Sequence, residues 1–406
     1  MKNFVSFISY GIKNKRIRIV SLLIDLFLLV YGSVESYYLL TENPSIIILV
    51  VTVFGNIIWQ GVSFKDLFKF CRVDYPNESS KVEVDYSRFV SKDESICRIG
   101  NNHIAFNLKE CKKLQKYNPE IQVDKQASKK VDNYILNYFD ILLPFLSKHY
   151  QESKNKVFVN DAKLCLPGNI SFTTPIRVSK GSYYNTYLTN KIFSRSLITN
   201  DSPNIYPPLS ILNNELCLPC EFFSNEIGVS TIAITSDGFM FFQVQGTHSD
   251  SSPGLIVPSG SGSADWNDYK RSSHNHLKEI IDYATVRELL EETGLKSKLQ
   301  KNVIASNKVI GFFRWLDYGG KPEFVSITKL NCRITDIKPQ SSEQKAYLSD
   351  NYIFCIFNKN KDVNEDELNK AFKVMESEQC STPLYASLLF IKELYYKNKK
   401  NLCCLL

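Results

Sequence analysis

A group of glutamates at helical spacing constrains this chain more than any other feature of its sequence. Glu288, Glu291 and Glu292 stand at i, i+3 and i+4, so a helix places them on one face. Like charges in this arrangement repel each other by about 0.2–0.5 kcal/mol per exposed pair. A divalent cation such as Mg²⁺, which takes oxygen ligands and leaves room for phosphates, would remove that repulsion. Taken alone, the three glutamates favour a solvated acidic face over a metal site.

The residues around this face favour metal chemistry instead. Glu279 stands eight residues before Arg287, and the string E-x7-R-E-L-L-E-E-T-G-L runs from Glu279 to Leu295. It resembles the signature of Nudix hydrolases, G-x5-E-x7-R-E-U-x-E-E-x-G-U with U aliphatic, at every specified position from Glu279 onward. The resemblance covers about residues 225 to 400 and implies an α/β/α sandwich with a mixed sheet.

The resemblance also implies roles for particular side chains. Glu288, Glu291 and Glu292 match the glutamates that bind Mg²⁺ (or Mn²⁺), one of which also helps to activate water. Arg287 matches the arginine that orients a neighbouring carboxylate, and Glu279 matches the first glutamate of the motif. We therefore expect a catalytic group of Arg287, Glu288, Glu291 and Glu292, with the three glutamates as metal ligands. The implied reaction cleaves a nucleoside diphosphate linked to another group.

The chain departs from the family pattern before Glu279. Ser273 stands where the motif has its glycine, and residues 261–278 extend a loop that is short in the family. Gly260 or Gly262 is expected to do the work of that glycine, ahead of an insertion. Because this loop shapes the phosphate site, the sequence leaves open whether the domain hydrolyses a nucleotide or only binds it. The expected ligand-binding residues are Glu279, Gly260, Gly262 and Arg287, and Glu323 and Glu343 are possible further acidic ligands.

The rest of this domain shows ordinary strand and helix patterns. Residues 229–235 and 239–245 are rich in β-branched and aromatic residues, and Ser236-Asp237-Gly238 between them predicts a hairpin turn. Further strands are predicted at 308–316 and 324–330, and a final helix at 383–396. Gly294 follows the acidic helix where a left-handed C-terminal cap is expected.

Two long apolar stretches precede these elements. Residues 19–40 and 45–64 each match the ~20 residues that a helix needs to cross a bilayer core. Basic residues flank the pair while the turn between them carries only Glu42, so the positive-inside rule predicts two cytoplasmic termini. Asp25 either lines a polar seam between assembled hairpins or reaches the cytoplasmic edge. Because the composition resembles that of a low-GC bacterium, we predict a multi-pass protein of the inner membrane; the alternative is a buried hairpin in a soluble domain.

The remaining segment, 73–227, gives weaker signals. Its tyrosines at 183, 184 and 187 cluster with two lysines, a mixture that either stacks a base or, more often, belongs to a half-buried strand. The 11 cysteines are odd in number and follow no framework spacing, which indicates a reducing compartment. The predicted class is α+β, with a transmembrane hairpin (1–72), a poorly defined α/β middle segment (73–227), a Nudix-type domain (228–402) and a tail (403–406).

Two functions follow from this architecture. Two spans joined to such a domain resemble the membrane effectors of bacterial cyclic-oligonucleotide antiphage systems (CBASS), which implies that a cyclic nucleotide is bound and the membrane is then disrupted. In that case the hairpins form a homo-oligomer whose assembly the ligand shifts. The alternative is a membrane-anchored, Mg²⁺-dependent Nudix hydrolase of a linear nucleotide, and a passive scaffold is the third possibility. The net charge of +7 is modest, so no duplex nucleic acid is expected as a partner.

Overall fold

The computed structural model describes a defined part of the 406-residue chain: 84–137, 162–193 with gaps at 169, 171 and 173, 197–199, 202–206, 220–246, 254–272, 275–295, 302–339, 348–358 and 362–397. Contacts divide the chain into two units. The first comprises Met1–Val82, Asp132–Asn160 and Arg195–Ile211, and its described strands are β6 (Leu197–Thr199) and β7 (Ser202–Tyr206), an antiparallel pair. The second comprises Glu83–Val131, Asp161–Ser194 and Leu212–Leu406, and it contains the acidic helix.

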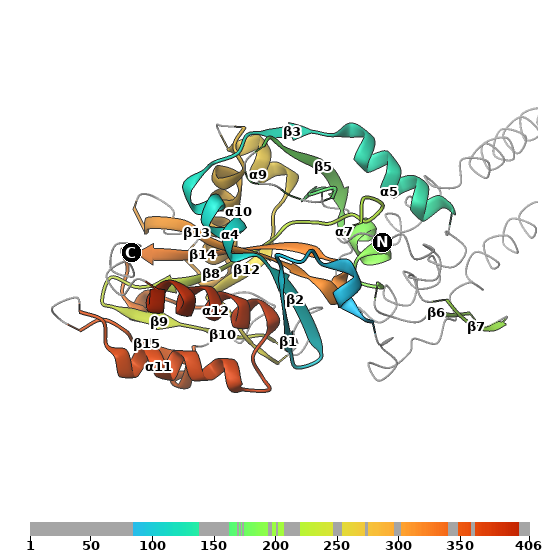
Figure 1. Cartoon of the computed structure of the whole chain (residues 1–406). Coiled ribbons are helices and arrows are strands. Elements are labelled where there is room, and N and C mark those ends of the chain that lie inside the picture. The colour runs from blue at the N-terminus through green and yellow to red at the C-terminus, as the bar shows by residue number, and fades with distance from the viewer. Residues whose placement is uncertain are drawn as a thin grey trace, which may run out of the picture. The chain divides into compact units, whose positions relative to one another are not determined.

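A mixed sheet forms the centre of the second unit (Figure 1). Its strand order is β1-β2-β13-β14-β8-β9-β15, and β12 pairs with β8. The pair β14–β8 is parallel and the other pairs are antiparallel. Its strands are β1 (Ser95–Ile99), β2 (Asn102–Phe106), β8 (Gly228–Ile234), β9 (Phe239–Phe241), β12 (Gly260–Ser263), β13 (Ile304–Trp315), β14 (Lys321–Leu330) and β15 (Ile353–Cys355).

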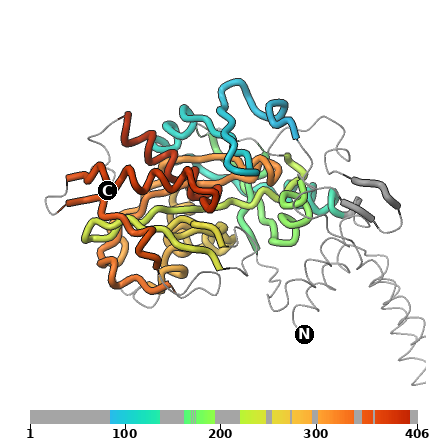
Figure 2. Tube along the Cα trace, turned by 90° about the horizontal axis from the view of Figure 1, so that it is seen from below, coloured from blue at the N-terminus to red at the C-terminus, as the bar shows by residue number. Residues whose placement is uncertain are grey.

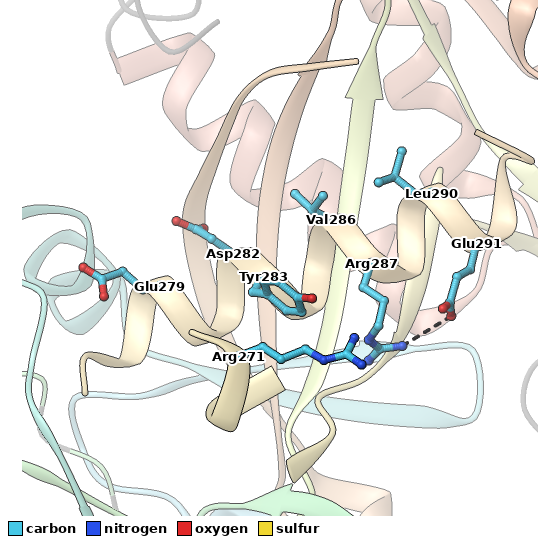
Figure 3. Close-up of a pocket in the computed structure, with 8 residues that line it drawn as sticks. All are labelled: Arg271, Glu279, Asp282, Tyr283, Val286, Arg287, Leu290 and Glu291. Carbon is cyan, nitrogen blue, oxygen red and sulfur yellow. Dashed lines mark hydrogen bonds and ion pairs between the residues drawn. The ribbon is translucent and has the colours of Figure 1, made fainter. Parts of the chain in front are cut away.

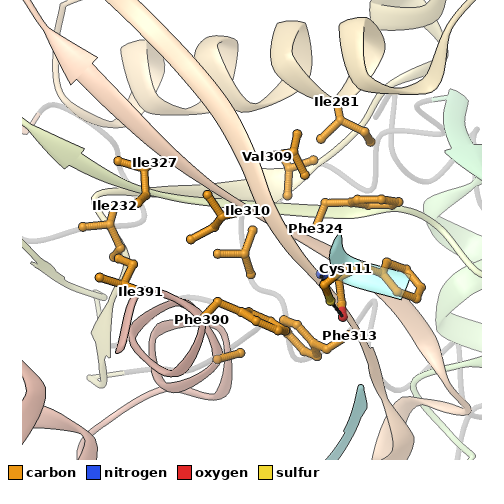
Figure 4. Packing of buried hydrophobic residues seen from close by; sticks show 14 of the residues in the cluster. Cys111, Ile232, Ile281, Val309, Ile310, Phe313, Phe324, Ile327, Phe390 and Ile391 are labelled. Atoms are coloured by element: carbon orange, nitrogen blue, oxygen red, sulfur yellow. Dashed lines mark hydrogen bonds between the residues drawn. The ribbon is translucent and has the colours of Figure 1, made fainter. Parts of the chain in front are cut away.

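Helices cover both faces of this sheet. Ile281 of α10 (Leu277–Glu292) lies on one side of the strands, and Phe390 and Ile391 of α12 (Thr382–Lys397) lie on the other (Figure 4). β-branched and aromatic side chains fill the space between the layers, since they suit a pleated surface that is buried. Gly311 of β13 admits the Phe390 ring, because a Cβ there would collide with it. The α/β/α layering and the mixed sheet expected from the sequence are therefore confirmed.

The other elements of this unit are short. A second small sheet has the order β3-β5-β4, and β10 pairs with β11. These strands are β3 (Ile121–Val123), β4 (Ala162–Cys165), β5 (Ile176–Ser182), β10 (Gln243–Val244) and β11 (Ile256–Val257). The helices are α4 (Leu108–Lys116), α5 (Lys125–Asn137), which runs past the unit's boundary, α7 (Tyr183–Thr189), α9 (Trp266–Arg271) and α11 (Glu365–Lys373). Single 3₁₀ turns lie at Tyr86–Phe89, Leu316–Tyr318, Ile334–Asp336, Asp350–Tyr352 and Val374–Glu376.

Segments far apart in the sequence meet in this unit. Strand β2 pairs with β13 through Ala105 opposite Arg314 and Ile104 opposite Trp315. Helix α4 also packs on β13, where the Cys111 thiol donates to the Phe312 carbonyl at 3.4 Å. Figure 2 shows the same junction from below, where the blue and cyan trace meets the orange strands. Strand β2 and helix α4 therefore belong to the same unit as the acidic helix, while the domain boundaries drawn from the sequence stay a prediction.

The transmembrane part of the predicted fold class is corrected. In the described part of the chain, no helix has both the length and the apolarity to cross a bilayer. The two predicted spans, 19–40 and 45–64, lie outside the described residues. The fold class is therefore α+β with a mixed sheet and no supported transmembrane hairpin. The predicted inner-membrane localisation, which depended on that hairpin, is withdrawn with it.

Candidate active site

Helix α10 carries the acidic residues and ends as the sequence predicts. Gly294 adopts a left-handed conformation with φ of 70°, where a side chain would be strained. The Thr293 hydroxyl donates to the Leu289 carbonyl at 2.6 Å and so satisfies one of the last carbonyls of the helix. The helix end is therefore fixed within one turn of the glutamates.

The orientation of α10 differs from the expected one. Tyr283, Val286 and Leu290 were placed on the helix face opposite the glutamates, which predicts that they pack on the sheet. Tyr283 is instead 37% exposed. Leu290 is buried in a second, smaller cluster, and Val286 lies at its edge. The face that packs on the sheet instead carries Ile281 and Ala284, with Glu288 and Glu292 further along the same face. Sequence spacing alone does not fix which face turns inward when both faces carry apolar residues.

Two glycines of β12 let α10 approach closely. A Cβ at Gly260 would lie 2.6 Å from the Leu289 Cα atom, in the backbone of the helix. A Cβ at Gly262 would instead collide with the Glu288 carboxylate. Both positions, predicted as ligand-binding, therefore lie beneath the acidic helix, where any side chain would push the helix or its carboxylate away.

Two of the three glutamates meet β12 at adjacent residues. Glu292 is only 7% exposed, and its Oε2 atom accepts a hydrogen bond from the Ser261 amide at 2.9 Å. The Glu288 carboxylate lies against Gly262, and burial raises its pKa to about 7, with Arg287 and Lys163 acting in the opposite direction and Glu291 adding to the rise. The Glu291 side chain is 34% exposed. The acidic face is thus directed partly into the protein, toward strand β12.

Arg287 holds several carboxylates together. Its guanidinium donates to both carboxylate oxygens of Asp268 at 3.0 and 2.9 Å. It also donates to Glu288 at 2.9 Å and to Glu291 at 3.4 Å. Asp268 belongs to the capping box of α9, in which its carboxylate accepts from the Asp265 amide at 2.8 Å. The extended loop therefore folds into a helix that supplies a carboxylate to the arginine.

Further charged residues belong to this part of the fold, and of these the sequence analysis named Glu323 alone, as a possible acidic ligand. The Lys163 ammonium, from β4, lies 2.7 Å from Asp265 Oδ1. Farther along, Lys321 and Glu323 of β14 form a buried ion pair at 2.5 Å, and Gly228 leaves space for the Glu323 carboxylate. The D-x-x-D spacing of Asp265 and Asp268 before a helical run was the one local signal that could have identified α9. Nothing in the sequence near Lys163 indicates this contact.

A cavity of 470 Å³ runs along the exposed side of α10 (Figure 3). Tyr283 lies beside it, and the Arg287–Glu291 pair lies at one end. Glu279 lies toward the other end of the helix. There its Oε1 atom accepts a hydrogen bond from the side-chain amide of Asn118 at 3.4 Å. The residues that line the cavity are Arg271, Glu279, Asp282, Tyr283, Val286, Arg287, Leu290 and Glu291.

The arrangement of these oxygen donors bears on the metal that the resemblance implies. Within the described residues, no group of three or more acidic, histidine or cysteine side chains converges closely enough to hold a metal ion. The chemistry of the donors fits Mg²⁺ or Mn²⁺, because Glu288, Glu291 and Glu292 offer oxygen ligands on a single helix. Glu323 is engaged by Lys321, and Ser273 and Glu343 lie outside the described residues.

The tyrosine cluster of the middle segment lies in a helix, so the predicted strand is wrong. Tyr184 and Tyr187 are buried in α7, and the Lys191 ammonium lies 5.1 Å from the centre of the Tyr183 ring. Ser182 caps the start of this helix, and its hydroxyl accepts from the Asn185 backbone amide at 3.2 Å. This N-terminal cap outweighs the strand preference of the aromatic residues.

Comparison with known proteins finds matches among solved structures. No family model matches the sequence, and no curated protein matches it. Similar solved structures include DR0079 from Deinococcus radiodurans, at 12% identity over 41% of this chain and 82% of that one, with a TM-score of 0.26. The MutT protein from Methanosarcina mazei Go1 matches at 15% identity over 43% of this chain and 96% of that one, also at 0.26.

A bifunctional NMN adenylyltransferase/ADP ribose pyrophosphatase from Francisella tularensis, complexed with AMP and a manganese ion, is also similar. It matches at 13% identity over 43% of this chain and 41% of its own length, with a TM-score of 0.23. Nudix hydrolases are thus among the structural neighbours of this chain. At these TM-scores the likeness does not by itself establish the family.

Proposed function

We propose that this chain is a Nudix-type pyrophosphohydrolase that requires a divalent cation and cleaves a nucleoside diphosphate linked to another group. The observation that carries the proposal is the placement of Glu288 and Glu292 against adjacent residues of β12. Around them, the carboxylates of Asp265, Asp268 and Glu291 outnumber the cationic groups of Arg287 and Lys163. A partly buried excess of negative charge is stabilised by a bound cation.

Each residue of the site has a role in this proposal. Glu288 and Glu292 would hold Mg²⁺ or Mn²⁺, and Glu291 is the next carboxylate on the helix. The bound ion would neutralise the diphosphate and make a water molecule more acidic. Arg287 fixes the Glu288 carboxylate through its contacts with Asp268, so that this ligand is preorganised. The Ser261 amide does the same for Glu292.

The cavity beside α10 supports a nucleotide as the ligand. Its volume of 470 Å³ lies within the range of about 300–1,000 Å³ that small-molecule sites occupy. The exposed Tyr283 ring offers a surface on which a base can stack, and Arg271 offers a positive charge. A linear or cyclic nucleotide remains the proposed partner. The role as a membrane effector is not proposed, because it requires the hairpin that the structure does not support.

The proposal is tested by turnover of the full-length protein with Mg²⁺ or Mn²⁺. The substrates are ADP-ribose, a nucleotide sugar, a dinucleoside polyphosphate and a nucleoside triphosphate, with a cyclic dinucleotide as a binding probe, and the release of nucleoside monophosphate is followed by chromatography. Glu288→Gln is expected to lower kcat by about 10²-fold or more, as removal of charge stabilisation at a reaction centre does. Glu378→Gln, on the exposed end of the turn after α11, is the matched control and keeps full activity. Turnover that needs no metal, or equal activity of the two variants, contradicts the proposal.

A further inference from the structure

The cavity beside α10 has a different chemistry at each end. Glu279 and Asp282 of α10 line it three residues apart, on one side of the helix. The Tyr283 ring follows them, and Arg271 reaches the cavity from α9. In Figure 3 the Arg271 side chain extends toward Arg287 and away from Glu279. Two carboxylates thus lie at one end of the cavity, and Arg271 lies toward the other.

A chain of hydrogen bonds through the central sheet holds the Asp282 carboxylate in place. The Thr231 and Thr328 hydroxyls lie 2.8 Å apart, and Thr328 donates to the side-chain oxygen of Asn307 at 2.6 Å. The side-chain amide of Asn307 then donates to Asp282 Oδ1 at 2.8 Å. This chain starts in β8 and crosses β14 and β13 before it reaches α10. The sheet therefore fixes the carboxylate through one of its two oxygens, so that it faces the cavity as a preorganised acceptor.

Glu279 adds acceptor capacity at the same end of the cavity. Its Oε1 atom accepts the long hydrogen bond from Asn118, at 3.4 Å. Its Oε2 atom is buried and has no hydrogen-bond partner among the residues that the structure describes. A buried carboxylate oxygen without a donor is costly, so a ligand that brings N–H groups to this end is favoured. Because ionised carboxylates accept hydrogen bonds and donate none, a ligand that brings carbonyl oxygens here is disfavoured.

Arg271 supplies positive charge that is not already used. Arg287 is engaged by three carboxylates. Arg271 is exposed, and no ion pair joins it to a carboxylate within the described ranges. A guanidinium of this kind can bind a phosphate through two parallel hydrogen bonds. The Tyr283 ring, 37% exposed, offers a face for a flat base, so the groups fit a nucleotide with its phosphate toward Arg271 and its base toward Asp282.

We propose that Asp282 is the specificity-determining residue of this cavity and selects guanine as the base of the ligand. The inference rests on the proposed function, since it takes the cavity as the nucleotide site. On its Watson–Crick edge guanine has two adjacent donors, the N1–H group and the N2 amine, which one carboxylate accepts as a pair. Adenine and cytosine have an amine beside a bare ring nitrogen, and uracil has one N–H group between two carbonyl groups. These bases turn an acceptor toward the carboxylates and therefore bind more weakly.

The experiment measures the binding of GMP and IMP to the full-length protein by isothermal titration calorimetry at pH 8, in EDTA and again in Mg²⁺. Burial raises the pKa of Asp282 to about 6, so its carboxylate is ionised at this pH. IMP lacks only the N2 amine of guanine. It is expected to bind about tenfold more weakly than GMP, because one hydrogen bond to a charged group is lost. Equal binding of GMP and IMP to the wild type overturns the proposal, and this comparison needs no variant to fold.

Asp282→Asn reverses the preference, because its amide can donate where the carboxylate only accepts. The variant is expected to lose the preference for GMP over IMP. It should also bind XMP, which has a carbonyl group in place of the N2 amine, about tenfold more tightly than the wild type does. Asp366→Asn, exposed in the first turn of α11, is the matched control and keeps the wild-type preference. A preference for GMP that survives Asp282→Asn assigns the selection to other residues and refutes the role of Asp282.

Arg271→Gln separates base preference from nucleotide binding itself. It removes the phosphate contact and is expected to weaken GMP and IMP by the same factor, about tenfold. If GMP and IMP bind the wild type equally and Arg271→Gln weakens both, guanine selection is wrong while the cavity stays the nucleotide site. If neither nucleotide binds, or Arg271→Gln binds both as the wild type does, the placement of the nucleotide in the proposed function is wrong as well.

Discussion

Two alanine substitutions in β12 separate stability from the geometry of the site. At Gly260 the added Cβ would lie 2.6 Å from the Cα, 2.9 Å from the Cβ and 3.0 Å from the amide nitrogen of Leu289. These atoms belong to the middle of α10 and cannot move without shifting the helix. Such overpacking costs about 1–3 kcal/mol. Replacing glycine also stiffens the unfolded chain, which returns about 0.4–1 kcal/mol. From the middle of each range, we expect Gly260→Ala to lose about 1.3 kcal/mol of unfolding free energy, which is the overpacking cost less this entropic gain.

At Gly262 the same methyl group meets a different neighbour. The atoms in its way are those of the Glu288 carboxylate, the far end of a flexible side chain. Gly262→Ala is therefore expected to lower the unfolding free energy less than Gly260→Ala does, because a side chain is displaced more easily than helix backbone, although the contact of Glu288 with Arg287 is disturbed. It should nevertheless weaken Mn²⁺ binding, because Glu288 is displaced. Urea unfolding followed by circular dichroism, together with a Mn²⁺ titration followed by electron paramagnetic resonance, measures both effects. If Gly262→Ala is the less stable variant, or Gly260→Ala is as stable as the wild type, the close packing of β12 on α10 is wrong.

The remaining predictions concern a titration, an ion-pair network and a fragment. Burial raises the pKa of Asp282 to about 6, with the Asn307 amide acting in the opposite direction. The ionised form of Asp282 is thus disfavoured in the folded protein, so the wild type loses stability as the pH rises from 4 to 7. Asp282→Asn does not ionise and should become more stable than the wild type by about 1–3 kcal/mol over this range. A difference between the two urea midpoints that stays constant with pH contradicts this. Arg287→Met leaves the carboxylate of Asp268, which is 1% exposed, without its bidentate partner and should lower the unfolding free energy by about 3–5 kcal/mol. Arg287→Lys should recover part of this loss. A urea midpoint of Arg287→Met like that of the wild type would disprove the ion-pair network. A fragment of residues 228–402 lacks β2, α4 and β4 and should show no cooperative thermal unfolding, whereas a sharp transition would show that these elements are dispensable.

Local signals in the sequence predicted local structure well. The turn at Ser236-Asp237-Gly238 is confirmed, with Gly238 at φ of 88°, and the cap at Gly294 is confirmed at 70°. The final helix, predicted at 383–396, spans Thr382–Lys397. Each of these features depends on residues within one or two turns of each other, so short-range conformational preferences decide them.

The assembly of the candidate site was largely unpredictable for the opposite reason. Lys163 meets Asp265 across about a hundred residues, and no periodicity in either segment indicates that strand β4 meets the start of α9. The inward turn of Glu288 and Glu292 depends on two glycines in a strand that lies before the helix. The apolar stretches at 19–40 and 45–64 were interpreted from length and flanking charge alone, which does not establish a membrane span. Tertiary contacts, rather than local preference, decide features of this kind.

The pairing of β2 with β13 has a consequence for synthesis of the chain. Ala105 and its partner Arg314 are separated by about 210 residues, so at roughly 5–20 residues per second the ribosome needs about 10–40 s to deliver the partner strand. During that interval the hairpin of β1 and β2 presents an unpaired edge, which is the kind of surface on which nascent chains associate wrongly. We expect the yield of folded protein to depend on chaperones that shield this edge, and to rise when translation of the intervening codons is accelerated.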